Sequence, residues 1–276
     1  MTQDISGKTI VITGGTMGIG EAAARRLRAA GAHVAITGRS ADSAALAARL
    51  GCDFFRADYA SLNDVRDLAA ALLAAYPRID ILANNVGGVM NKRTLTEDGH
   101  ERTFQVNHLG GFLLTHLLQE RLEESQAVVI NTSSRAHNVG HLDLGDLENA
   151  NGYEAFRAYG TAKLMNILHA DEINRRFRHV TAVSFHPGVV ATGFGRAGSP
   201  LIRFVYDNPL TGLFMISPDK GADTLAWLAE TQPGVENGWQ PGQYYVKRKL
   251  GQKSAQAADE TLAAKLWDAS MAIVAV

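Results

Sequence analysis

The stretch Ile10-Val11-Ile12-Thr13-Gly14-Gly15-Thr16-Met17-Gly18-Ile19-Gly20 decides the fold of this chain. Its first three residues predict a buried strand, and the Ala-, Arg- and Leu-rich residues after it predict a helix. The first turn of a helix has unpaired N–H groups and the positive end of the dipole, and glycines let an anion approach the backbone. The spacing is T-G-x-x-x-G-x-G rather than G-x-G-x-x-G. Alone, it predicts either an anion site or an ordinary glycine-rich turn.

Composition narrows the classes of protein to consider. The 276 residues are 46% hydrophobic and 20% charged, which is ordinary for a globular protein. A net charge of −1 gives no electrostatic reason to expect a nucleic acid or an anionic membrane as partner. No apolar run reaches the roughly 18 residues of a membrane span, and the N-terminus does not resemble a signal peptide. The single cysteine, Cys52, excludes an internal disulfide and a cysteine-based zinc cage. We expect a cytoplasmic protein with no membrane anchor and no metal.

Strands and helices alternate along the chain, with short connections between them. Strands are predicted at 8–13, 33–37, 52–57, 79–83, 127–131 and 180–185, with a short seventh at 244–246. Helices are predicted at 21–30, 43–50, 64–76, 97–124 and 153–177. Fully apolar strands with helical connections favour a parallel sheet covered on both faces. The expected fold is α/β: a Rossmann-type, doubly wound three-layer sandwich with about seven parallel strands, forming one domain over residues 1–276.

Small or polar residues follow the predicted strands. In an open parallel sheet, ligands bind beyond the carboxyl ends of the strands, so these residues should meet at one edge. After the glycine loop they are Arg39-Ser40, Asp58, Asn84-Asn85-Val86-Gly87, Thr132-Ser133-Ser134 and His186-Pro187-Gly188. Any one of these groups is ordinary turn chemistry. Six strand ends of this kind together favour a ligand site.

Tyr159 and Lys163 lie four residues apart on a predicted helix, so their side chains share one face. A lysine ammonium beside a phenol favours the phenolate and lowers its pKa from about 10 toward physiological pH. The pair is therefore a candidate general acid and base. The same spacing also occurs by chance on amphipathic helices.

Over roughly the first 195 residues, the chain resembles the short-chain dehydrogenase/reductase family. The resemblance is carried in order by the loop at 13–20, Asp58, Asn84 to Gly87, Asn107, Ser134, Tyr159, Lys163 and His186-Pro187-Gly188. Within the family, the retinol-dehydrogenase-like branch is similar at 106–115, at Ser133-Ser134-Arg135-Ala136-His137 and in the wide spacing from Ser134 to Tyr159. Light-dependent protochlorophyllide reductases and polyketide-antibiotic ketoreductases look similar over the same stretches.

This resemblance implies a role for each matching residue. Tyr159 would donate the proton to a substrate carbonyl, and Ser134 would hold the carbonyl oxygen. Lys163 would lower the pKa of Tyr159 and bind the nicotinamide ribose, and Asn107 would hold a water that links Lys163 to solvent. The implied cofactor contacts are Gly14, Thr16, Met17, Gly18, Ile19, Gly20, Arg39, Ser40, Asp58, Asn84, Asn85, Gly87, Tyr159, Lys163, Pro187, Gly188, Val190 and Thr192. Asp58 and Asn84 would frame the adenine and its ribose.

The end of the second strand bears on the choice of cofactor. An acidic residue about 20 positions past the glycine loop binds the 2′-hydroxyl of NAD, whereas an arginine accommodates the 2′-phosphate of NADP. This chain has Arg39-Ser40 there and no acid before Asp42. The sequence therefore favours NADP(H), with NAD(H) as the alternative; Arg39 could also be an ordinary solvated arginine.

The expected function is an oxidoreductase that exchanges a hydride between NADP(H) and a small, hydrophobic carbonyl compound or secondary alcohol. The irregular segment 189–218 is the expected cover of the substrate pocket, although it could be only a surface loop. Two departures from the family matter: Ala162 stands where serine is frequent, and the chain lacks the N-terminal anchor of membrane-bound retinol dehydrogenases. The alternatives are a silent NADP(H)-binding sensor and a light-dependent tetrapyrrole reductase. The family also suggests a homodimer or homotetramer, with part of the predicted helix at 97–124 and the predicted helix at 153–177 forming one interface.

Overall fold

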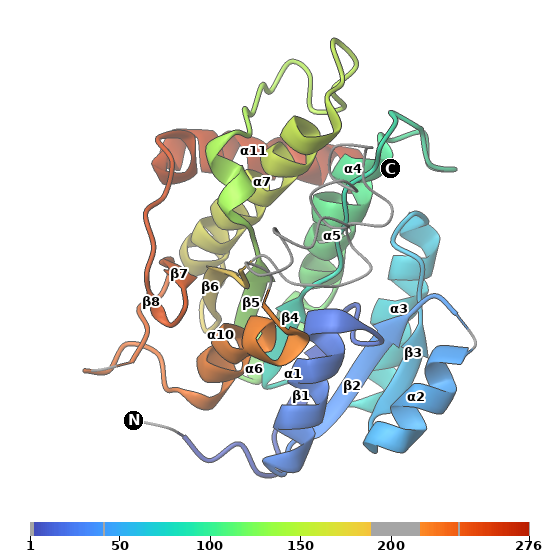
Figure 1. Ribbon diagram of the computed structural model, residues 1–276, viewed down its shortest axis with the longest axis vertical. Coiled ribbons are helices and arrows are strands. Elements are labelled where there is room, and N and C mark those ends of the chain that lie inside the picture. The colour runs from blue at the N-terminus through green and yellow to red at the C-terminus, as the bar shows by residue number, and fades with distance from the viewer. Residues whose placement is uncertain (1–2, 41, 189–215, 237, 276) are drawn as a thin grey trace.

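The computed structural model describes residues 3–40, 42–188, 216–236 and 238–275. One sheet runs through the molecule in the order β3-β2-β1-β4-β5-β6-β7-β8 (Figure 1). Neighbouring strands from β3 to β7 are parallel, and β8 is antiparallel to β7. The strands are β1 (Thr9–Ile12), β2 (His33–Gly38), β3 (Asp53–Arg56), β4 (Ile81–Asn84), β5 (Val128–Thr132), β6 (Thr181–His186), β7 (Tyr244–Val246) and β8 (Lys249–Leu250). The doubly wound parallel sheet is confirmed.

The eighth strand is an addition to the predicted seven. It forms a hairpin with β7 through Lys247 and Arg248, whose φ angles of 51° and 60° lie in the left-handed region. Both residues of β8 are exposed. A strand of two exposed residues has no apolar alternation, so the sequence pattern could not predict it.

Helices cover the sheet between these strands. Their bounds are α1 (Gly18–Ala29), α2 (Asp42–Leu50), α3 (Leu62–Ala75), α4 (Arg102–Phe104), α5 (Gly110–Leu117), α6 (Gln119–Glu124), α7 (Ala155–Arg176), α10 (Pro218–Glu230) and α11 (Glu260–Val274), with a π-helical turn η1 (Gln105–Leu109) and 3₁₀ turns η2 (Arg135–Asn138) and η4 (Gln256–Ala258). Ser61 caps α3 by accepting a hydrogen bond from the Asp64 N–H at 3.3 Å. Within the described ranges, no helix is both long and apolar enough to cross a membrane.

Two hydrophobic cores lie on opposite faces of the sheet. Ile10 and Ile12 of β1 pack on the side of α1 and α10, whereas Val11 between them packs on the side of α3, α5, α7 and α11. Successive side chains of a strand point to opposite faces, so a strand buried on both faces must be apolar throughout. The three-layer sandwich follows from this pattern.

The predicted helix over 97–124 ends where predicted, at Glu124, but is wrong in its start and in its continuity. It begins only at Arg102, because Gly99 has a φ of 83° and Leu95 and Glu101 form an antiparallel bridge. The buried carboxylate of Glu101 caps the helix by accepting hydrogen bonds from the N–H groups of Thr103 and Phe104, at 2.8 and 2.9 Å. The π-helical turn η1 then interrupts the α-helical geometry before α5.

Helix α11 covers the face formed by α5 and α7. The Trp267 ring lies 4.9 Å from the ring of Phe112 and 5.9 Å from the ring of Phe177, measured between centroids. The guanidinium carbon of Arg176 lies 5.2 Å from the Trp267 ring centroid. This is the helix pair expected to form a subunit interface, and the chain's own last helix packs against it.

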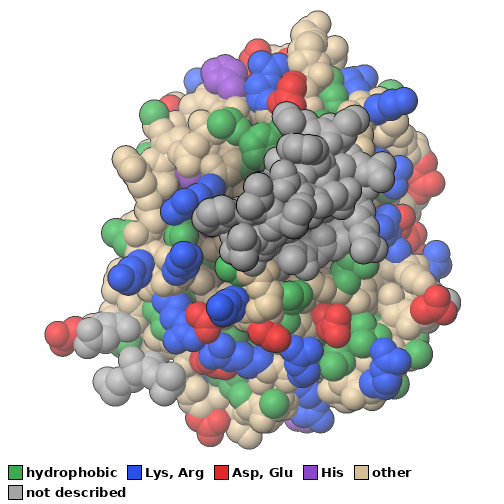
Figure 2. Space-filling view, in the orientation of Figure 1, with side chains coloured by type: hydrophobic (Ala, Val, Ile, Leu, Met, Phe, Trp, Pro, Cys, Tyr) green, Lys and Arg blue, Asp and Glu red, His purple; other side chains and the backbone are tan. Residues whose placement is uncertain are grey.

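Charged side chains of both signs mix on the face shown in Figure 2. Ion pairs join α1 to α10: Arg26 pairs with Asp223 at 3.1 Å and with Glu230 at 2.6 Å, and Arg25 pairs with Asp219. Arg248, from the β7–β8 hairpin, also pairs with Asp223. The pairs are partly exposed, so each stabilises the fold modestly, by about 0–1 kcal/mol.

Candidate active site

The glycine loop between β1 and α1 is shaped for close approach of its own backbone. Gly14 and Gly18 have φ angles of 65° and 58°, a region that favours glycine. A β-carbon on Gly20 would lie 2.3 Å from the carbonyl oxygen of Gly14. Met17, just before α1, is extended and offers no side-chain hydrogen bond to the helix. The first N–H groups of α1 thus remain available for an anion.

Thr13 and Asn85 tie neighbouring strand ends together. The Thr13 hydroxyl donates to the carbonyl of Ala83 at 3.2 Å and accepts from the N–H of Asn85 at 2.8 Å. The Asn85 amide nitrogen donates to the carbonyl of Thr13 at 3.0 Å, and its oxygen accepts from the Thr132 hydroxyl at 3.2 Å. These bonds fix the ends of β1, β4 and β5 relative to one another at the ligand edge.

Asn84 points into the protein rather than along the edge. Its amide nitrogen donates to the Thr115 hydroxyl at 2.9 Å and to the Asn131 side-chain oxygen at 3.0 Å, and the residue is buried. This places the side chain between β5 and α5. The structure therefore gives the Asn84 side chain interior contacts.

Two arginines share the corner at the end of β2. Arg39 and Ser40 are both exposed, and the Arg56 Nε donates to the main-chain oxygen of Arg39 at 3.2 Å. The register pairs Gly38 with Arg56, which explains why they meet. Arg56 was not predicted as a site residue. Its position at the end of the next parallel strand, beside Arg39, could have indicated a second cation at this corner.

Asp58 and the first residues after β6 belong to turns at the same edge. The Asp58 carboxylate accepts from the Ala60 N–H at 3.0 Å, and its own N–H donates to the Asp64 carboxylate at 3.0 Å. Pro187 and Gly188 follow β6, and Gly188 has a φ of 97°. The predicted contacts Val190 and Thr192, and residues 189–215 of the expected pocket cover, lie outside the described residues.

Tyr159 and Lys163 are both buried on α7. The Lys163 Nζ lies 5.6 Å from the centroid of the Tyr159 ring and donates a hydrogen bond to the carbonyl of Thr132 at 3.2 Å. Burial lowers the pKa of Lys163 to about 7. The structure thus brings the predicted pair together, beside the carboxyl end of β5.

The loop after β4 approaches the Tyr159–Lys163 pair closely at Gly87. A β-carbon on Gly87 would lie 2.5 Å from the Asn107 Oδ1 and 2.7 Å from the Lys163 Nζ. The Asn107 Oδ1 accepts from the N–H of Gly88 at 2.9 Å, and its Nδ2 donates to the carbonyls of Gly88 and Thr103, each at 2.9 Å. Asn107 therefore holds the loop after β4 against η1, and a side chain at position 87 would force the side chain of Asn107 or Lys163 to move.

Ser134 lies two residues after β5 and is the N-cap residue of η2. Its hydroxyl oxygen accepts from the N–H of Ala136 at 3.2 Å, and the residue is half-buried. The neighbouring Ser133 hydroxyl donates to the main-chain oxygen of Lys163 at 2.6 Å, which ties β5 to α7. The Ser134 hydroxyl hydrogen remains available to a ligand because the bond from Ala136 uses the oxygen only as an acceptor.

His186 supports the turn that follows β6. Its Nδ1 accepts a hydrogen bond from the N–H of Arg135 at 3.4 Å. Burial, followed by the charges of Arg135 and Lys247 and the nearby His137, lowers the pKa of His186 to about 4. The ring is therefore neutral at physiological pH and hydrogen-bonded, which suits a turn residue rather than a base.

A doubly wound parallel sheet, with a glycine loop and a buried Tyr/Lys pair at its carboxyl edge, defines a nucleotide-binding α/β protein. The family model described as short chain dehydrogenase matches residues 8–199. The chain belongs to the short-chain dehydrogenase family, in its retinol-dehydrogenase-like branch.

Relatives and solved structures agree with this membership. The Streptomyces sp. (strain C5) protein named "Putative daunorubicin C-13 ketoreductase DnrU" is 45% identical over 98% of this chain and 93% of its own length. Human retinol dehydrogenase 11 is 35% identical over 98% of this chain and 86% of its own length. The Pseudomonas aeruginosa RhlG/NADP active-site complex superposes with a TM-score of 0.66 and 27% identity, covering 87% of this chain and 94% of that one.

Proposed function

We propose that this chain is an NADP(H)-dependent carbonyl reductase or alcohol dehydrogenase, with Tyr159 as proton donor and acceptor. The observation that carries the proposal is the buried Tyr159–Lys163 pair, with the Lys163 Nζ 5.6 Å from the Tyr159 ring centroid and Ser134 at the end of the adjacent strand. Membership in an oxidoreductase family supports the reaction class.

The residues fit a dinucleotide at the carboxyl edge. The close packing at Gly20 leaves room for backbone alone, and the start of α1 presents N–H groups to a pyrophosphate. Arg39 and Arg56 provide two cations at the corner where a 2′-phosphate would lie. The NADP complex of a structural neighbour supports the same cofactor.

The nicotinamide, when bound, supplies the hydride. Tyr159 then donates its phenolic proton to the carbonyl oxygen of the substrate, and the Ser134 hydroxyl donates a hydrogen bond to the same oxygen. A protonated Lys163 favours the phenolate that remains, because opposite charges in a buried site attract strongly. The main-chain carbonyl of Asn107 accepts a hydrogen bond from the Asn166 Nδ2 at 3.0 Å, and in this proposal its second lone pair holds a water.

The proposed substrate is a hydrophobic ketone or aldehyde, or the corresponding alcohol. The relative named as a C-13 ketoreductase supports a ketone, and the retinol dehydrogenases support an apolar substrate. Turnover is measured as oxidation of NADPH at 340 nm with a panel of apolar ketones and aldehydes. Tight NADPH binding without turnover on the whole panel would favour a sensor, and turnover of a tetrapyrrole only under illumination would favour a photochemical reductase.

A further inference from the structure

A buried hydrogen-bond chain runs from the last helix to the proposed proton-transfer site. Ser270 of α11 lies 3.2 Å from the Nε2 of His108, and the Nδ1 of His108 lies 3.3 Å from the Oδ1 of Asn166. The Asn166 Nδ2 donates to two main-chain carbonyls, that of Asn107 at 3.0 Å and that of Thr132 at 3.1 Å. The side chains of Ser270, His108 and Asn166 are all buried.

The direction of each bond follows from the donors available. The Asn166 Nδ2 faces two carbonyl oxygens, so its Oδ1 must accept, and the Nδ1 of His108 must carry the proton. Burial lowers the pKa of His108 to about 4, so the ring is neutral and its Nε2 accepts a bond from the Ser270 hydroxyl. The hydrogen bonds therefore all run in one direction, with each donor facing the next acceptor from the Ser270 hydroxyl to the two carbonyls.

Both carbonyls belong to the proposed site. The Thr132 oxygen accepts from the Lys163 Nζ at 3.2 Å and from the Asn166 Nδ2, which uses both of its lone pairs. The Asn107 carbonyl is the proposed water-holding group. Without the Asn166 amide, each of these buried oxygens would lose one hydrogen-bond partner.

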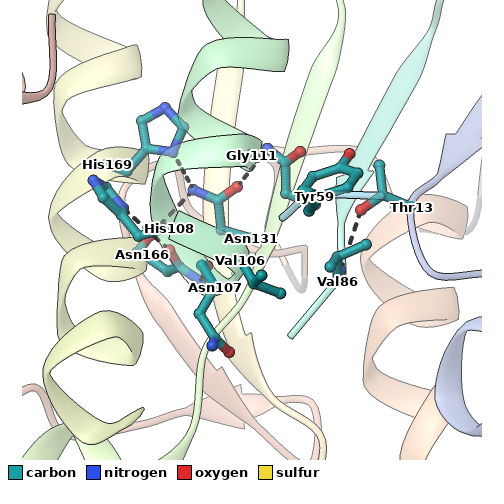
Figure 3. Close-up of a pocket in the computed structure, with 11 residues that line it drawn as sticks. Thr13, Tyr59, Val86, Val106, Asn107, His108, Gly111, Asn131, Asn166 and His169 are labelled. Atoms are coloured by element: carbon teal, nitrogen blue, oxygen red, sulfur yellow. Dashed lines mark hydrogen bonds between the residues drawn. The ribbon is translucent and has the colours of Figure 1, made fainter. Parts of the chain in front are cut away.

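Asn166 itself is fixed from the opposite side as well. Its main-chain oxygen accepts a bond from the Asn131 Nδ2 at 3.1 Å. Asn166, His108 and Asn131 line an internal cavity of about 10 Å³, space for about one water, and Figure 3 shows the bond between His108 and Asn166 at its wall. Three buried polar atoms on this cavity have no hydrogen-bond partner among the described residues: the Tyr59 hydroxyl, the Asn84 Oδ1 and the His169 Nε2.

We propose that Asn166 is a positioning residue that fixes the Asn107 carbonyl and the Lys163 acceptor, and that His108 and Ser270 hold it in place. Helix α11 thereby takes part in ordering the site. The inference rests on the proposed function, because it assigns Asn166 a place beside the same proton-transfer groups.

The other titratable or charged groups near this site are few among the described residues. Lys163 lies on the same helix as Tyr159, and His108 of η1 is near enough to Lys163 to interact with its charge. Tyr244 on β7 interacts electrostatically with Tyr159 and with Arg135 of η2. None of these groups is changed in the variants below, so a shift in the titration of Tyr159 reports on Asn166.

The main test is Asn166→Asp, which keeps the size of the side chain. An ionised carboxylate cannot donate to the two carbonyls, and its negative charge disfavours the Tyr159 phenolate. We expect kcat to fall at least about tenfold, KM for NADPH to change less than about threefold, and the acidic limb of the pH–rate profile for alcohol oxidation to move to higher pH. Asn174→Asp is the matched control, since Asn174 lies on the same helix and bonds only the main chain of Ala170 and Ala182.

A second variant and a second measurement keep the test decisive. Ser270→Ala removes the donor to His108 and should lower kcat about fivefold, the worth of one hydrogen bond, so it tests the chain even if Asn166→Asp does not fold. The phenolate of Tyr159 is titrated by ultraviolet difference against Tyr159→Phe without any substrate, and its midpoint should rise by about one pH unit or more in Asn166→Asp. An unshifted midpoint, or losses equal to those of Asn174→Asp, would overturn the proposal. If the wild type turned over none of the carbonyl compounds, that would instead count against the proposed function. The titration of Tyr159 would still test the role of Asn166.

Discussion

The side-chain nitrogen of Lys163 donates a hydrogen bond to the main-chain carbonyl of Thr132 at 3.2 Å, in a position where the lysine is buried. One neutral acceptor does not compensate for the loss of water around an ammonium, so burial lowers the pKa of Lys163 to about 7. The group that should favour the Tyr159 phenolate therefore changes its charge near neutral pH in the cofactor-free protein.

This pKa predicts how stability depends on pH. The pKa of Lys163 is about 7 in the folded protein and about 10.4 in the unfolded chain, so the unfolded state binds more protons between these values. The contribution of Lys163 to the free energy of unfolding is thus fully present above pH 10.4 and is lost as the pH falls toward 7. Relative to Lys163→Met, the wild type should gain up to about 1.4 kcal/mol per pH unit over this range.

The measurement is urea unfolding of both proteins at several pH values from 6 to 10, without cofactor. Lys265→Met is a suitable control, because Lys265 lies on α11 and is exposed. A difference between wild type and Lys163→Met that does not change with pH would contradict the lowered pKa.

Tyr159→Phe tests the proton donor directly. The change removes only the hydroxyl, so NADPH should still bind with a similar Kd while turnover falls at least about a thousandfold. NADPH binding is followed by fluorescence and turnover by absorbance at 340 nm. An unchanged rate would remove Tyr159 from the mechanism, and loss of both binding and turnover would point to a structural defect.

Gly87→Ala tests the close approach between the loop after β4 and the Tyr/Lys pair. The added methyl group would lie 2.5 Å from the Asn107 Oδ1 and 2.7 Å from the Lys163 Nζ, so at least one of these atoms must move. We expect kcat/KM to fall about tenfold or more. At the adjacent Gly88, an added methyl meets only the Met90 side chain at 3.8 Å, so Gly88→Ala should lose far less. Equal losses in the two variants would mean that the spacing at Gly87 is not important.

Arg39→Ala and Arg56→Ala test the corner that should hold the 2′-phosphate. Each should raise KM for NADPH about tenfold or more and leave KM for NADH nearly unchanged, because only NADP carries that phosphate. Arg49→Ala is the control, since Arg49 is an exposed arginine near the end of α2. A preference for NADH that is already present in the wild type and persists in Arg39→Ala would contradict the assignment.

Local pattern predicted the elements that depend on it. The apolar strands and the glycine loop can be recognised from neighbouring residues alone. Ser61, a serine just before the helical segment, is likewise a typical N-cap residue of α3. Signals for α10 were also present, since Ser217 caps that helix and Pro218 occupies its first turn, but they were not used. The position of Arg56 depends on strand register, which the sequence specifies only through the sheet.

The rest depends on contacts between distant parts of the chain. The start of α4 is set by a bridge between Leu95 and Glu101, and glycine spacing could not show it. The sequence places Asn84 at a strand end and so predicts a ligand contact. The hydrogen bonds that its side-chain nitrogen donates to Thr115 and Asn131 depend on distant residues. The bond between His108 and Ser270 joins residues 162 positions apart, which no local periodicity reports.

The π-helical turn η1 also bears on which changes in chain length this protein tolerates. Such a turn uses one residue more than an α-helix does, and in η1 the consecutive residues Asn107 and His108 are both buried. Loss of a single codon within 105–109 could restore a regular α-helix, but it would rotate one side of that helix against the other by about 100°. Asn107 and His108 could then no longer both face their present partners. We therefore expect substitutions along this helix to be tolerated far more often than single-residue deletions.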